Sequence, residues 1–152
     1  MAREVGSATS VGSAQARIAA GAAGGLAGGV VFGMLMQMMD MLPMVAMLVG
    51  SKSVAVGWVV HLAISAFIGA TFGLLLGGRA TRFGTSAALG VGYGALWWAL
   101  GPLVIMPARL GMELFVVDAV ALQSLMGHLL YGLALGLVFT LVERRVEQAQ
   151  AA

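Results

Sequence analysis

The chain has 152 residues, of which 61% are hydrophobic and only 9% are charged, and its formal net charge is +2. A soluble domain is normally about 45–50% apolar and about 25% charged, so this composition excludes both an ordinary soluble enzyme and a disordered chain. The positive balance does not indicate nucleic-acid binding, because the eight Lys and Arg residues form no basic patch. The sequence therefore predicts an integral membrane protein that is embedded in the lipid bilayer.

The predicted elements follow from the apolar segments in chain order. Residues 1–17 are small and polar, which predicts a flexible tail. The segment 18–39 is apolar apart from Gln37 and Met-rich at its end, and it has about the 20 residues that a spanning helix needs. The segments 54–76, 85–104 and 119–142 have similar lengths and contain no Asp, Glu, Lys or Arg. We therefore expect an all-α, four-helix transmembrane bundle.

The orientation of the bundle follows from its positive charges, which accumulate in cytoplasmic segments. Six arginines lie in the two tails and the loop 79–84, whereas only Lys52 and Arg109 lie in the other two loops. Both termini are therefore predicted to be cytoplasmic, in a multi-pass protein of the inner or plasma membrane. The expected organisation is a tail 1–17, a first hairpin 18–78, a loop 79–84, a second hairpin 85–142 and a tail 143–152.

The two halves of the chain resemble each other. Pro43 matches Pro102 at a displacement of 59 residues, and His61 matches His128 at a displacement of 67, after an eight-residue insertion in the third loop. This pattern predicts two parallel two-helix repeats, of the kind found in transport proteins. A chance alignment of glycine-rich helices is the alternative.

Glycines recur at four-residue spacing in every predicted helix, which places them on one face. Such faces allow close helix packing in lipid. Polar residues extend these faces and are predicted to point into the bundle, in its outer half. Polar groups inside a membrane usually bind a ligand or pair with one another. The predicted ligand-binding residues are Gln37, Asp40, His61, Ser65, Ser124 and His128; the alternative is that these groups only link helices.

Ten of the eleven methionines fall in the predicted outer half. Thioether sulfur together with imidazole selects a soft cation such as copper(I). Methionine is also a flexible apolar filler of irregular gaps, which is the alternative reading. The predicted metal ligands are His61, His128, Asp40, Met41, Met44, Met47 and Met106.

These residues favour a small protein that binds or translocates a cation as a homo-oligomer. One alternative is an accessory or assembly subunit that docks on a larger membrane-protein complex through its glycine faces. Another is a protein that holds haem b between His61 and His128. The sequence contains no nucleophile motif, P-loop or dinucleotide fingerprint, so it gives no reason to expect an enzyme.

Overall fold

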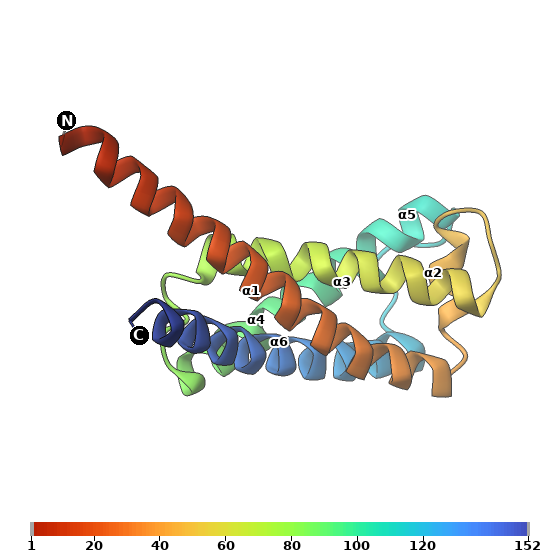
Figure 1. Ribbon diagram of the computed structural model, residues 1–152. Coiled ribbons are helices and arrows are strands. Elements are labelled where there is room, and N and C mark those ends of the chain that lie inside the picture. The colour runs from red at the N-terminus through yellow and green to blue at the C-terminus, as the bar shows by residue number, and fades with distance from the viewer. Residues whose placement is uncertain (1, 152) are drawn as a thin grey trace.

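The computed structural model describes residues 2–151, and the side chains of residues 14–146, 148 and 149. It is an all-helical bundle of four long helices (Figure 1). The long helices are α1 (Ala2–Met38), α3 (Val54–Leu76), α4 (Phe83–Leu100) and α6 (Ala119–Ala151). Three short elements lie at the end of the bundle away from the termini: α2 (Leu42–Met47), the π-helix η1 (Gly101–Ile105) and α5 (Met106–Leu110).

Four helical stretches are long and apolar enough to cross a membrane, which confirms the predicted spans. The chain is therefore a small multi-pass membrane protein. The stretches are Ala14–Met38, Val54–Leu76, Phe83–Leu110 and Ala119–Val146. Helix α1 also includes most of the segment 1–17, whose flexibility stays a prediction.

The third span is longer than expected, because the helix does not end near Pro102. A proline in a helix lacks an N–H and clashes with the carbonyl one turn earlier. Here the backbone widens into η1, where the N–H of Met106 donates to the carbonyl of Gly101, and then continues into α5. Single π-turns of this kind are frequent at functional sites.

The helices pack as two pairs, because glycines let their backbones approach. A Cβ on Gly21 of α1 would overlap the carbonyl oxygen of Gly69 on α3, and one on Gly90 of α4 would overlap that of Gly132 on α6. Helices α1 and α6 then join the two pairs. The predicted close packing of the glycine faces is confirmed at these contacts.

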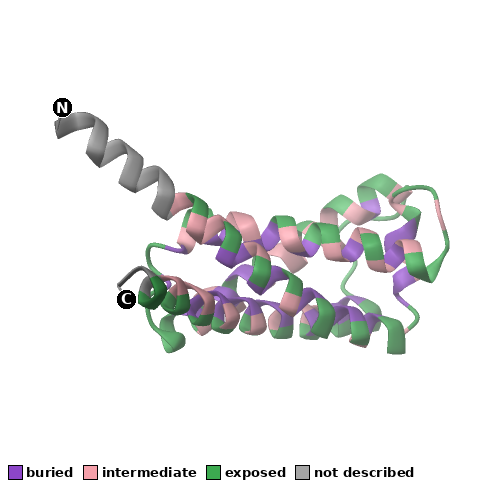
Figure 2. Cartoon of the chain, viewed as in Figure 1, coloured by how far each residue is buried: buried purple, intermediate pink, exposed green. Residues whose placement is uncertain are grey.

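Helices α3 and α4 meet differently, through side chains alone. The Tyr93 and Thr71 hydroxyls are 2.8 Å apart, and the Phe67 and Trp97 rings touch with centroids 6.5 Å apart. Figure 2 shows buried residues on the faces that the helices turn toward one another. In the half of the bundle near the termini, Phe72 and Phe139 are fully buried and their rings pack edge to face. The interior of the bundle is therefore filled in that half, and a cavity lies in the other.

Candidate functional site

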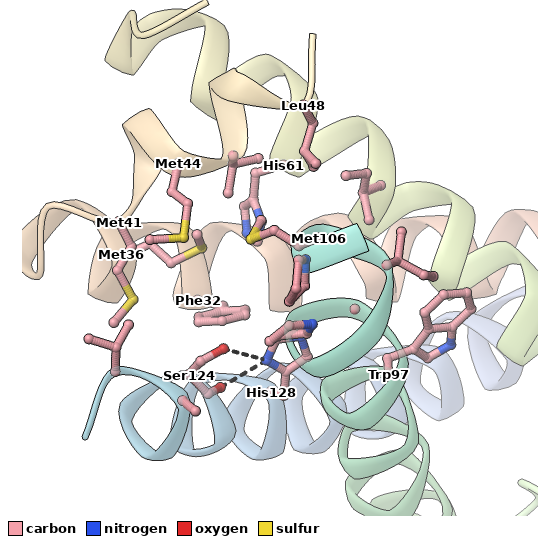
Figure 3. A pocket seen from close by; sticks show the side chains of 18 of the residues that line it. Phe32, Met36, Met41, Met44, Leu48, His61, Trp97, Met106, Ser124 and His128 are labelled. Carbon is pink, nitrogen blue, oxygen red and sulfur yellow. Dashed lines mark hydrogen bonds between the residues drawn. The ribbon is translucent and has the colours of Figure 1, made fainter. Parts of the chain in front are cut away.

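A cavity of about 660 Å³ lies in the half of the bundle away from the termini, where α3 and α4 are held apart (Figure 3). All four long helices, the short elements α2, η1 and α5, and the segment after α5 contribute to its wall. Most of the wall is apolar, with a few polar groups, and such a cavity of about 300–1,000 Å³ is typical of a small-molecule site. The polar groups are His61, Ser65, Glu113, Asp118, Ser124, His128 and Tyr131.

His61 reaches the cavity from α3 and is buried. Its Nε2 donates to the backbone carbonyl oxygen of Gly29 on α1, at 2.9 Å. A carbonyl oxygen can only accept, so Nε2 carries the proton and Nδ1 of the neutral ring keeps a free lone pair. Gly29 lies directly against Ser65, one turn after His61. This close approach of α1 and α3 brings the Gly29 carbonyl oxygen within reach of the imidazole.

His128 reaches the same cavity from α6, with the opposite nitrogen in use. Its Nδ1 donates to the carbonyl oxygen of Ser124, one turn earlier, at 2.8 Å (dashed in Figure 3). The lone pair is therefore on Nε2. Within the described part of the chain, Trp97 Nε1 is the one fully buried side-chain nitrogen or oxygen without a partner. The free nitrogens of the two histidines are therefore not fully enclosed by protein, and both residues line the cavity.

Phe32 of α1 lies between the two imidazoles. Its ring contacts His61 and His128 edge-to-face, with centroid distances of 5.4 and 4.7 Å. The Phe32 ring lies against Gly127 of α6, and any larger residue there would overlap the ring. Sequence reasoning missed Phe32, since nothing in its local pattern separates it from the other apolar residues of that helix.

Several methionines join the histidines. Met41 and Met44 of the α2 region and Met106 of α5 point into the cavity together with Met36 of α1 (Figure 3). Met47, which was predicted to share the metal site, is 42% exposed and is not part of the wall. Three of the four predicted methionines therefore lie with the two histidines, while Met47 lies apart.

Gln37 and Asp40 also lie apart from the cavity, so the expectation that they point into the bundle is wrong. Both are exposed and border a smaller hollow beside Pro43. Gln37 accepts a hydrogen bond from Trp58 Nε1 at 2.6 Å. Helix α1 ends at Met38 and Asp40 has a left-handed φ of 54°, so the helical register no longer predicts direction there.

The donor set limits which cofactors the cavity could hold. Among the described residues, no three His, Asp or Glu side chains gather around one point. A haem held by both histidines would have to lie between their rings, where Phe32 stands, so the residues do not fit a haem. A soft metal ion bound through imidazole and thioether groups fits the donors that are present.

Comparison with known proteins gives no match: no family model, no curated protein and no solved structure is similar to this chain at a significant level. The class of the protein, a four-helix multi-pass membrane protein, follows from its own helices. The cavity is the feature of the structure that bears on its function.

Proposed function

We propose that this protein binds a soft monovalent cation, copper(I), in the cavity. The observation that carries the proposal is the convergence of three thioethers and an imidazole from separate elements. Met41 and Met44 come from the α2 region, Met106 from α5 and His61 from α3, and all line one cavity.

The ligand chemistry favours copper(I) over harder ions. Thioether sulfur selects soft cations and imidazole suits copper among other transition metals, whereas carboxylates suit magnesium, calcium or manganese. All of the ligands named here are neutral, and moving charge into an apolar region is costly. A monovalent ion therefore loses less hydration energy than a divalent ion would in the same place.

The hydrogen bond from His61 to the Gly29 carbonyl supports the same proposal. A metal-binding histidine usually donates its other ring N–H to a carbonyl or carboxylate, which fixes the ring and its tautomer. The bond from His61 Nε2 to Gly29 does this and directs Nδ1 to the cavity. Ser65 and Ser124 would complete the polar wall, and His128 would be a further ligand or a separate acceptor on the other side of Phe32.

The direction of uptake follows from the proposed topology. With the Arg-rich tails in the cytoplasm, the cavity would lie on the outer side and receive the ion there. Phe72 and Phe139 close the inner half of each chain. The chain alone would therefore be a receptor for the ion, and movement across the membrane would require a homo-oligomer.

The test is copper(I) competition with a chromophoric chelator, on the full chain purified in detergent. We expect one bound equivalent, and about tenfold weaker binding or more when Met41, Met44 and Met106 are all replaced by Leu. The matched control replaces the exposed Met34, Met38 and Met126 by Leu, and should bind like the wild type. An absence of binding by the wild type, or equal affinities of the two triple variants, would contradict the proposal.

A further inference from the structure

We infer that the cavity contains a second subsite, beside His128, for an apolar organic molecule that carries a hydroxyl group. This inference goes beyond copper binding and does not rest on it. The cavity measures about 660 Å³, whereas one water molecule occupies about 30 Å³ in the liquid. A metal ion bound to four side chains of the wall would leave most of this volume unfilled.

The wall of this volume selects the body of the molecule. Ile64, Phe67 and Ile68 line it from α3, Trp97 from α4 and Val120 from the start of α6. These side chains offer dispersion contacts and no charge. Burial of apolar surface against such a wall favours an alkyl chain or an aromatic ring.

His128 selects the polar end of the molecule. Its Nδ1–H is held by the Ser124 carbonyl, and its Nε2 is an accessible acceptor without a partner in the described part of the chain. An acceptor requires a donor, and a hydroxyl group supplies one at a lower desolvation cost than an ammonium group. Phe32 separates this nitrogen from His61, so a molecule could occupy it without displacing the methionine ligands.

The carboxylates of the wall do not make this a cation site. Asp118 accepts a hydrogen bond from the Ala121 N–H at 2.8 Å and caps α6, and both Asp118 and Glu113 are exposed. Neither is buried beside His128. Among the described residues, the wall therefore offers two uncharged groups without partners, the His128 Nε2 lone pair and the Trp97 Nε1–H, and a hydroxyl group can donate to the first or accept from the second.

The boundary between α3 and α4 supplies a route from the bilayer. On the cavity side these helices touch through the Phe67 and Trp97 rings, and Phe67 is 61% exposed. Rotation of these side chains would open the gap without moving a backbone. A lipid-soluble molecule could thus enter sideways.

The test compares two probes that share one bromoundecyl chain, 11-bromoundecanol and its methyl ether, on the metal-free full chain in detergent. Binding is followed by bromine quenching of tryptophan fluorescence at matched micellar fractions. A net hydrogen bond predicts that the wild type prefers the alcohol about two- to tenfold. His128→Phe should abolish this preference, whereas His61→Phe should retain it although it lowers copper affinity. Equal affinities of alcohol and ether for the wild type, or a preference that survives His128→Phe, would overturn the inference.

A pair of variants covers the case in which His128→Phe fails to fold. Ile64→Phe places a phenyl ring in the cavity wall and leaves less volume for either probe. Quenching by both probes should therefore weaken at least about threefold. Leu75→Phe adds the same ring to the exposed surface of α3, outside the cavity, and should leave quenching unchanged. Unchanged quenching in Ile64→Phe would refute binding in this cavity, whatever the outcome of the copper measurements.

Discussion

Replacing Gly90 by Ala should destabilise the bundle, whereas replacing Gly92 by Ala should not. Both glycines lie on α4, but a Cβ on Gly90 would overlap the carbonyl oxygen of Gly132, while one on Gly92 meets nothing within 4 Å. Each alanine gains about 1 kcal/mol of helix propensity. Since this gain cancels in the comparison, the difference isolates the overpacking cost, which is about 1–3 kcal/mol.

The obstacle at Gly90 is backbone and cannot rotate away, so the upper part of that range is expected. The free energy of unfolding can be measured in mixed micelles by titration with sodium dodecyl sulfate, followed by circular dichroism. Gly132→Ala offers a check from the partner helix, because its Cβ would overlap the carbonyl oxygen of Gly90. If Gly90→Ala were as stable as Gly92→Ala, the close approach of α4 and α6 would be refuted.

Two further predictions concern the core and the topology. Tyr131→Phe removes a buried hydrogen bond of 2.8 Å from the hydroxyl to the Ser65 carbonyl. The free energy of unfolding should fall by about 1 kcal/mol in the same titration. Unchanged stability would show that the bond contributes nothing. The chain has no cysteine, so a single Cys at Lys52 should react with a membrane-impermeant maleimide in intact cells. A single Cys at Arg79 should react only after permeabilisation, and the reverse result would invert the proposed orientation.

Part of the candidate site was predictable, because it lies within regular helices. His61, Ser65, Ser124 and His128 all line the cavity, as their register with the glycine faces predicted. Outside the helices the same argument failed. Asp40 lies beyond the end of α1, where its backbone turns into the left-handed region and redirects the chain.

The contacts that shape the cavity were beyond prediction, because they join residues far apart in the chain. Phe32 lies between His61 and His128 only because Gly127 of another helix leaves space for its ring. The tautomers depend on Gly29 and Ser124 carbonyls, and the first of these belongs to a different helix. No local pattern specifies such partners.

The sequence by itself determined the class of protein and the four spans. A backbone in lipid must satisfy its own hydrogen bonds, so a long uncharged apolar segment has little choice but to form a helix. Glycine spacing then determined which faces could pack closely. Only the tertiary structure decided that α3 and α4 stay apart, that the methionines and histidines share one cavity and that Gln37 and Asp40 do not. The reason is physical: helix formation depends on each segment alone, whereas a cavity depends on how the side chains of all the helices fill the space between them.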